Sequence, residues 1–542
     1  MSKRVYGIDL GTTYSAIATL DEYQMPKIIE NEVDATPTLA SAVYFPGGSE
    51  PIVGIEAKNH AEIDPNNVVQ FVKRQIGKED AKIWEFDGVK YGPIEISTEI
   101  LKQMKRYVKD QTGDDVVDVV ITCPAYFKTN ERNATKRAGE DAGLNVLNIV
   151  NEPTAAALSY CSREYQEDRK ILVYDLGGGT FDVTLLDFSV DESGNASIQV
   201  LATDGDDQLG GIDWDNLLFN YIANEYSVEV GIEIDDFEPL LRQHIRSQIE
   251  GIKQSLSKMP NKNVMISNSG DITSINVTRD AFEELTKSKV EETMDFVHRV
   301  LEDTKTEPDD VNIVLLVGGS SNMPMIKSAV ESLFPGKVRL EEPNKAIAKG
   351  AALSAAIEWN EKMLERIEDL KSGKILSTQD DELPQTEEDI KAQMINVPRH
   401  LTSDKPVVKD ILSCSFGPGV IVNGEFMINN LLFDGDSTPA TASETYYTPE
   451  EDLEFIEIPI FDNISKEEFV TPCEDGDGNE QDTDPDLKVR RIDKKSNLKL
   501  PLPPNTPKGS PIETTFYYDT NGLTVTVKNP NTGEEEQVNL DV

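Results

Sequence analysis

The sequence predicts an α/β protein with two facing lobes, followed by a smaller all-β domain. Three observations carry this prediction. A strand–turn–strand unit containing Asp-Leu-Gly occurs twice, at residues 5–18 and 171–186. Strand-like and helix-like segments alternate up to about residue 360, which is the pattern of an α/β fold. From 409 to 542 apolar residues instead recur at every second position, as in the strands of a β-sandwich.

Each copy of the repeated unit is an apolar run that ends in Asp-Leu-Gly and continues through a threonine-containing turn into a second apolar run. This pattern predicts a β-hairpin with glycine at its tip. Glycine lets the backbone approach a ligand closely, and successive N–H groups in such a turn bind anions. The aspartate that ends each first strand, Asp9 or Asp175, is suited to hold a hydrated Mg²⁺ ion. One copy alone would be interpreted as an ordinary hairpin, whereas two copies suggest two lobes that bind one polyphosphate.

Strands and helices alternate between and after the two hairpins. In order, the sequence predicts strands at 41–45 and 51–54, an amphipathic helix from a serine cap at Ser97 to about Gln111, a strand at 116–122, and helices through 135–139 and from 155. A later helix at 243–257 places Glu250, Lys253 and Ser257 on one face, because they are three and four residues apart. Alone, this trio favours a solvated face with one ion pair.

The third glycine turn and the remaining segments complete the predicted organisation. A buried strand at 313–317 runs into Gly-Gly-Ser before a helix, a geometry that contacts nucleotides but is weak evidence alone. Residues 361–408 continue a charged helix into a polar, acidic stretch, which we interpret as a linker or insertion. The acidic run at 473–482 begins like a calcium loop, but Glu480 stands where glycine is required, so an acidic hairpin insertion is favoured.

Composition excludes several classes of function. The chain has 98 Asp plus Glu against 52 Lys plus Arg, a formal charge of −46, which argues against nucleic acid or an anionic membrane as a partner. No apolar run is long enough to span a membrane, and the N-terminus does not resemble a secretory leader. The four cysteines are scattered without a CxxC pair, which predicts reduced thiols rather than disulfides or a zinc site. We therefore expect a cytoplasmic protein.

The first 360 residues closely resemble the ATPase domain of the 70-kDa heat-shock protein (DnaK-type) chaperone family. The segments that carry this resemblance are residues 7–15, 72–77, 121–127, 151–157, 175–182 and 317–320. The resemblance implies an actin-like ATPase domain at 1–360, made of two ribonuclease H-like lobes that close over Mg-ATP. Between the two domains, the charged helix and acidic linker at 361–408 stand as an insertion relative to the family. Residues 409–542 look more loosely like the family's peptide-binding β-sandwich, and the helical lid of the family is not found after them.

The resemblance implies a role for each matching residue. Lys73 neutralises the γ-phosphate and positions the attacking water, and Glu152 and Thr180 complete the polar cage around that water. Asp9 and Asp175 hold the waters of Mg²⁺, and Asp182 with Tyr14 is a possible K⁺ site. The β- and γ-phosphates contact the two glycine turns, at Gly11, Thr12, Thr13, Tyr14, Gly177, Gly178, Gly179 and Thr180. Ribose and adenine contact Glu250, Lys253, Ser257, Gly318, Gly319 and Ser320. Pro124 and Arg132 relay the nucleotide state towards the peptide domain.

Phosphoryl transfer depends on positioning and charge neutralisation, which one lysine, one metal ion and backbone donors supply. In isolation Lys73 would be interpreted as a solvated helix lysine, and only its place in this set of residues indicates catalysis.

The sequence also departs from the family. Gln254 and Asn322 stand where the family typically has two arginines that sandwich adenine, which predicts a weaker grip on the base and faster nucleotide exchange. Asn148 replaces the arginine that contacts J-proteins. At 410–415 the usual run of leucines has become Ile-Leu-Ser-Cys, although each buried leucine would contribute about 1.5–3 kcal/mol. We therefore expect weaker docking between the two domains.

Two functions remain open. The first is an ATP-dependent chaperone that hydrolyses ATP to ADP and phosphate and binds unfolded or extended polypeptide, with a J-protein and a nucleotide-exchange factor as partners. Ile456 and Ile458 are candidate walls of its peptide pocket, and are equally well interpreted as sandwich core. The alternative is a lidless, nucleotide-gated scaffold or co-chaperone for one protein partner. A sugar kinase is disfavoured because a β-sandwich follows and the residues around Gly77 match the chaperones.

Overall fold

The structure is a computed structural model that describes residues 3–31, 36–78, 80–162, 169–192, 195–268, 270–340, 342–372, 386–398, 401, 408–412, 414–422, 425–463, 465–471, 489–492, 498–519 and 522–540. The chain divides into two compact units. The first contains Met1–Phe127 and Ala134–Val408, and the second contains Lys128–Asn133 and Lys409–Val542. Each unit is described by itself below.

The first unit contains two sheets with the same local topology. One sheet has the order β11-β10-β1-β2-β3, with strands Asn145–Asn151, Asp118–Cys123, Tyr6–Asp9, Tyr14–Leu20 and Pro26–Ile28. The other contains β18-β17-β12-β13-β14, with strands Val338–Arg339, Ile313–Val317, Arg169–Leu176, Phe181–Val190 and Ala196–Asp206. In the first sheet β1 pairs antiparallel with β2 and parallel with β10. In the second sheet β12 pairs antiparallel with β13 and parallel with β17. The repeated sequence unit is therefore a repeated structural unit, one in each lobe.

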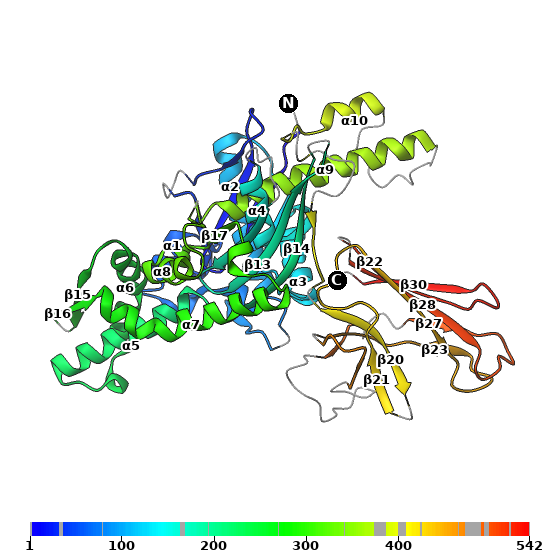
Figure 1. Ribbon diagram of the computed structural model, residues 1–542. Helices are drawn as coiled ribbons and strands as arrows, with labels where there is room; N and C mark the ends of the chain where they lie inside the picture. The colour runs from blue at the N-terminus through cyan, green and yellow to red at the C-terminus, as the bar shows by residue number, and fades with distance from the viewer. Residues whose placement is uncertain are drawn as a thin grey trace. The chain divides into compact units, whose positions relative to one another are not determined.

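Helices cover each sheet and separate hydrophobic cores form beneath them. The first lobe carries the helices α1 (Ile55–His60) and α2 (Pro93–Thr112), and the chain then continues into α3 (Thr129–Asp141) and α4 (Glu152–Cys161). Its short strands are β4 (Leu39–Ala40), β5 (Ala42–Tyr44), β6 (Ile52–Val53), β7 (Val68–Gln70), β8 (Trp84–Phe86) and β9 (Val89–Tyr91). The second lobe carries α5 (Gly211–Val230), α6 (Pro239–Lys258), α7 (Arg279–Asp303), α8 (Pro324–Leu333) and the hairpin β15–β16 (Asn261–Asn268, Asp271–Thr278). Figure 1 shows α5, α6 and α7 grouped near that hairpin.

The long helix α9 (Ala346–Ser372) packs against the first sheet, and glycine permits this close approach. A Cβ on Gly7 of β1 would lie 2.0 Å from the backbone nitrogen of Ala352. A Cβ on Gly350 of α9 would lie 1.7 Å from the carbonyl oxygen of Ala155 on α4. Beyond this contact, Trp359, Met363 and Ile367 of α9 share a core with Ile390 of α10 (Glu387–Gln393). Helix α10 therefore packs against α9.

Most predicted elements are present, with shifted boundaries. The helix predicted from 155 is α4 and begins at Glu152, and the strand predicted at 116–122 is β10, Asp118–Cys123. The strand predicted at 313–317 is β17 with the same bounds, and the helix predicted at 243–257 is α6, Pro239–Lys258. The serine cap predicted at Ser97 is wrong. Helix α2 begins at Pro93, because the backbone N–H of Gly92 bonds to Glu95 Oε2 at 2.8 Å and proline occupies the first turn, while Ser97 is buried inside the helix.

The second unit contains two main sheets that share one core. The five-stranded sheet has the order β25-β21-β20-β24-β26, with strands Phe469–Val470, Glu425–Asn429, Ser415–Val422, Ile460–Asn463 and Arg490–Arg491. The four-stranded sheet has the order β22-β28-β29-β30, with strands Ala440–Tyr447, Pro511–Asp519, Gly522–Lys528 and Glu535–Leu540. Phe416 of the first sheet and Phe516 of the second belong to the same cluster of buried residues. Ile458 belongs to this cluster and Ile456 packs against it, which favours their interpretation as core over a peptide pocket.

Three smaller findings bear on the sequence predictions. Within the described residues, no helix has the length and apolar character needed to cross a membrane. The described cysteines Cys123, Cys161 and Cys414 are buried. The acidic run at 473–482 and most of the acidic stretch after α9 lie outside the described residues.

Candidate functional site

A cavity of about 1040 Å³ lies between the two lobes of the first unit. Most of the predicted site residues line it: Asp9, Gly11, Thr13, Tyr14, Glu152, Asp175, Gly177, Gly178, Glu250, Lys253, Ser257, Gly318, Gly319 and Ser320. The predicted residues Thr12, Lys73, Gly179, Thr180 and Asp182 are not part of the lining. The structure therefore gathers residues from both hairpins, α4, α6 and the third glycine turn around one cavity.

The tips of the two hairpins touch across this cavity. A Cβ on Gly178 would lie 2.0 Å from Thr13 Oγ1, and a Cβ on Gly179 would lie 2.4 Å from Thr12 Cγ2. Real Cβ atoms do not approach so closely, so glycine is needed at both positions for the tips to meet. The facing tips bring glycine backbone together with the hydroxyl-bearing Thr12 and Thr13, a combination that suits an anion with several oxygens.

A buried ion pair lies behind the tips. Lys73 follows the left-handed residue Phe71 (φ 61°) in a short 3₁₀ turn, η2 (Val72–Gln75), and its ammonium contacts the carboxylate of Glu152 at the start of α4. The side chains of Lys73 and Glu152 are 5% and 7% exposed. Burial lowers the pKa of Lys73, but the charges of Glu152 and Asp9 outweigh burial and raise this pKa above its ordinary value. Lys73 therefore carries a full positive charge inside the protein.

Three aspartates join this pair, and all have raised pKa values. Burial and the charge of Glu152 raise the pKa of Asp9 to about 7. Burial and the same neighbour raise the pKa of Asp175 and of Asp182 well above the usual range, while Lys73 lowers all three. The cluster has four carboxyl groups and Lys73 as the cation that opposes them, so its charge is unbalanced.

This imbalance fits a bound cation. Asp175 Oδ2 and Asp182 Oδ1 are buried and have no hydrogen-bond partner in the structure, and such atoms call for a ligand or ion. Within the described residues, no three His, Cys, Asp or Glu side chains converge closely enough to ligate a metal directly. A hard cation that keeps its water shell, such as Mg²⁺, fits a site of this kind.

The far end of the cavity is built by α6 and by the turn after β17. Lys253 donates to the carbonyl of Gly211 at 2.9 Å and pairs with Asp215 at 2.8 Å. The hydroxyl of Ser257 donates to the carbonyl of Lys253 on its own helix at 3.1 Å. Gly318 has φ 79°, and a Cβ there would lie 2.3 Å from the carbonyl oxygen of Leu176, so this close crossing of β12 requires glycine.

Tyr14 links this end to the first lobe. Its hydroxyl donates to Glu250 Oε1 at 2.9 Å and accepts from Lys58 Nζ at 2.7 Å, and Lys58 also pairs with Glu250. Sequence reasoning missed Lys58 and Asp215. Lys58 lies 192 residues from Glu250 on the short helix α1, and no local pattern there indicates a site.

The side chains that depart from the family's pattern each donate a hydrogen bond to another residue of the same unit. Gln254 donates to Glu250 at 3.1 Å and Asn322 donates to the carbonyl of Gly319 at 2.9 Å, and both line the cavity. Asn148 donates to Glu358 of α9 at 2.7 Å. Burial raises the pKa of Glu358 to about 7, and the nearby Glu361 and Glu365 raise it too, whereas the bond from Asn148 lowers it.

The duplicated hairpin-and-sheet lobes around one cavity define an α/β domain of the actin-like, two-lobed class. Residues 5–371 match the family model described as Hsp70 protein. Over 366 residues the chain is 38% identical to the chaperone protein DnaK of Thermosipho melanesiensis, an alignment that covers 66% of this chain and 60% of that relative. The chain belongs to the Hsp70 family. Because the match spans only about 60% of the relative's length, it leaves the activity and partners of the whole protein as proposals.

Proposed function

We propose that the protein is an ATP-dependent chaperone that hydrolyses ATP to ADP and phosphate and binds unfolded or extended polypeptide. The observation that carries this proposal is the pair of touching hairpin tips backed by the buried Lys73–Glu152 pair. Family membership supports it, since the similar protein from Thermosipho is named a chaperone.

In this proposal the two glycine turns bind the phosphates. The turn at Gly177, Gly178 and Gly179 presents its backbone to the phosphates, and Thr12 and Thr13 offer hydroxyls from the facing lobe. Lys73 neutralises charge that develops on the terminal phosphate, which is the main requirement of phosphoryl transfer. Glu152 orients Lys73 through their ion pair, and Glu152 and Thr180 hold the attacking water.

Mg²⁺ would be held through water by Asp9 and Asp175, and it would supply charge to the phosphate oxygens. Asp182, with its unpartnered buried oxygen, is the proposed K⁺ contact. At the far end Glu250, Lys253, Ser257 and the turn at Gly318, Gly319 and Ser320 hold ribose and adenine. Gln254 and Asn322 lack the flat cation that stacks best on a base, so we propose a weaker hold on the nucleoside.

We further propose three segments along the chain: the ATPase domain at 1–360, the charged helix and acidic linker at 361–408, and a substrate-binding sandwich at 409–542. The boundary between the compact units, at Val408, supports the second division. Pro124 and Arg132 are proposed to relay the nucleotide state towards the peptide-binding domain. A nucleotide-exchange factor and a J-protein are proposed partners.

The alternative is a nucleotide-gated scaffold for one protein partner. The observation that favours it is the contact between Asn148 and Glu358, because the position expected to offer a cation to a J-protein instead offers an amide bonded within the chain. The scaffold would bind ATP, but a peptide would not change its turnover.

Steady-state ATP hydrolysis separates these functions. Wild type and Lys73→Ala are compared with and without an unstructured apolar peptide. Lys102→Ala is the matched control, because Lys102 forms a surface ion pair with Glu99 on α2 at 2.9 Å. Turnover that disappears only in Lys73→Ala and rises with peptide supports the chaperone. Turnover that ignores the peptide supports the scaffold, and turnover that survives Lys73→Ala refutes the role of the lysine.

A further inference from the structure

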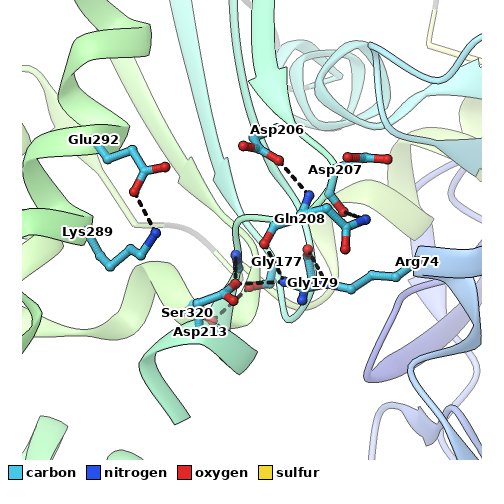
Figure 2. Close-up of polar contacts among 12 residues, drawn as sticks. Arg74, Gly177, Gly179, Asp206, Asp207, Gln208, Asp213, Lys289, Glu292 and Ser320 are labelled. Atoms are coloured by element: carbon cyan, nitrogen blue, oxygen red, sulfur yellow. Dashed lines mark hydrogen bonds and ion pairs between the residues drawn. The ribbon is translucent and has the colours of Figure 1, made fainter. Parts of the chain in front are cut away.

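Arg74 joins the phosphate turn of the second lobe to the first lobe. It follows Lys73 in η2, and its guanidinium makes three bonds to the second lobe (Figure 2). Nε donates to the carbonyl of Gly179 at 2.7 Å, while Nη2 donates to the carbonyl of Gln208 at 3.0 Å and to Asp213 Oδ2 at 2.7 Å. Sequence reasoning did not single out Arg74.

Each carbonyl group of the turn at Gly177–Gly179 accepts a hydrogen bond, but the donors come from different lobes. The carbonyl of Gly177 accepts from the N–H of Gly211 at 3.0 Å and from the hydroxyl of Ser320 at 2.8 Å. The carbonyl of Gly178 accepts from the N–H of Ile212 at 2.8 Å. These donors belong to the second lobe itself. The carbonyl of Gly179 accepts from Arg74 of the first lobe.

The direction of a carbonyl decides the direction of the next N–H group. A trans peptide is planar, so its C=O and its N–H point in opposite directions. The bond from Arg74 to the carbonyl of Gly179 therefore also sets the direction of the N–H of Thr180. Glycine has a wide range of backbone angles, and without this bond the Gly179–Thr180 peptide can rotate.

Other contacts hold both Asp213, which accepts from Arg74, and the turn that carries Arg74. Asp213 lies in the first turn of α5 and also accepts from the N–H of Gly210 at 2.8 Å. On the other side, Phe71 begins the turn of Arg74 with φ 61°, a conformation that a bulky residue keeps only when its surroundings impose it. The planar, permanently charged guanidinium can meet several acceptors at once, which an ammonium group cannot do in the same geometry.

We propose that Arg74 is a positioning residue for ATP hydrolysis. It orients the Gly179–Thr180 peptide from the facing lobe, so the phosphate turn reaches its hydrolytic geometry only when the lobes are closed. Lys73 and Arg74 are neighbours in η2, so the closure that brings Arg74 to the carbonyl of Gly179 moves Lys73 with it. This inference rests on the proposed ATPase function and adds a residue that acts on the turn rather than on the nucleotide.

The test compares wild type, Arg74→Gln and Arg74→Lys, with Arg299→Gln as the matched control. Arg299 donates to Asp204 at 2.7 Å, a bond as short as that of Arg74 to Asp213, but both partners lie in the second lobe outside the cavity lining. Three quantities are measured: kcat for ATP, the dissociation constant of ATP, and amide hydrogen exchange of peptides covering 177–181 in the nucleotide-free protein. Thermal unfolding confirms that each variant is folded.

We expect Arg74→Gln to lower kcat by about tenfold or more, since small misplacements in an active site have large effects on rate. The dissociation constant should change less than kcat, and exchange at 177–181 should become faster. Arg74→Lys should recover only part of the kcat and only part of the slow exchange at 177–181. Arg299→Gln should resemble wild type in kcat, dissociation constant and exchange.

Two results would overturn the inference while leaving the ATPase proposal intact: normal kcat in Arg74→Gln, or a loss of affinity that accounts for the whole loss of rate with unchanged exchange. If wild type itself shows no ATP turnover, the proposed function fails, and this inference fails with it.

Discussion

The charge balance around Lys73 makes a signed prediction about stability. Replacing Lys73 with methionine keeps most of the side chain's volume and removes the cation that opposes the four buried carboxyl groups. Replacing Glu152 with glutamine keeps the shape and removes the carboxylate whose charge raises the pKa of the three aspartates. In nucleotide-free protein without divalent cations, Lys73→Met should be destabilised, whereas Glu152→Gln should be as stable as wild type or more stable. Both variants should lose ATP hydrolysis.

The magnitude follows from the burial of the pair. Removing one partner of a buried ion pair costs about 3–5 kcal/mol, because the other charge is left without compensation. The first unit has about 400 residues, and at about 2.1 cal/mol/K per residue its unfolding entropy is about 0.8 kcal/mol/K. Lys73→Met should therefore lower Tm by about 4–6 °C. Glu152→Gln relieves repulsion on the aspartates and should not lower Tm.

Thermal unfolding of the two single variants and the double variant tests this reasoning. The double variant should be more stable than Lys73→Met alone, because neighbouring charges couple and their effects do not add. Excess Mg²⁺ with ADP should stabilise Lys73→Met by more degrees than it stabilises wild type, since a cation would replace part of the lost charge. Equal Tm values for Lys73→Met and wild type, or equal losses in the two single variants, would refute the proposed imbalance.

Three further predictions concern other parts of the first unit. Gly178→Ala places a Cβ 2.0 Å from Thr13 Oγ1. Because overpacking costs about 1–3 kcal/mol, this variant should bind ATP about tenfold more weakly in calorimetric titration. Unchanged affinity would show that the tips need not touch. Arginine at both Gln254 and Asn322 should strengthen ADP binding by about 0.5–2 kcal/mol and slow its release in a stopped-flow chase, and unaltered release would argue against base stacking there. Folding raises the pKa of Glu358 from 4.5 to about 7. Ionised Glu358 therefore lowers the free energy of unfolding, by an amount that is zero below about pH 4.5 and grows until about pH 7. Glu358→Gln should therefore raise Tm at pH 8 by more than at pH 5, and an equal change at both would rule out this titration.

Local sequence was sufficient where neighbouring residues determine the structure. The Asp-Leu-Gly hairpins, the strand Ile313–Val317 and the helix α6 depend on apolar periodicity and on glycine, and all are present. The start of α2 was predicted wrongly at Ser97, although Pro93 was a valid signal for the first turn. A serine near a helix start is ambiguous, because the same residue type can cap a helix or be buried within it.

Long-range contacts were beyond the reach of pattern reasoning. Lys73 alone has the sequence context of a solvated lysine, and it is buried because Glu152, 79 residues away, pairs with it. Arg74 and Asp213 are 139 residues apart, and Lys58 and Glu250 are 192 residues apart. Neither Arg74 nor Lys58 has a local signature, since an arginine or lysine on a short helix is usually solvated.

The sequence by itself determined the class of fold, the duplication of the hairpin and the residue types at the phosphate turns, because glycine, aspartate and threonine at these positions act through their own backbone and short side chains. Only the tertiary structure decided that the two tips touch, that Lys73 is buried among four carboxyl groups and that Arg74 holds the carbonyl of Gly179. These features depend on how the lobes meet. The physical reason is that burial, charge compensation and hydrogen-bond direction belong to pairs of groups brought together by folding.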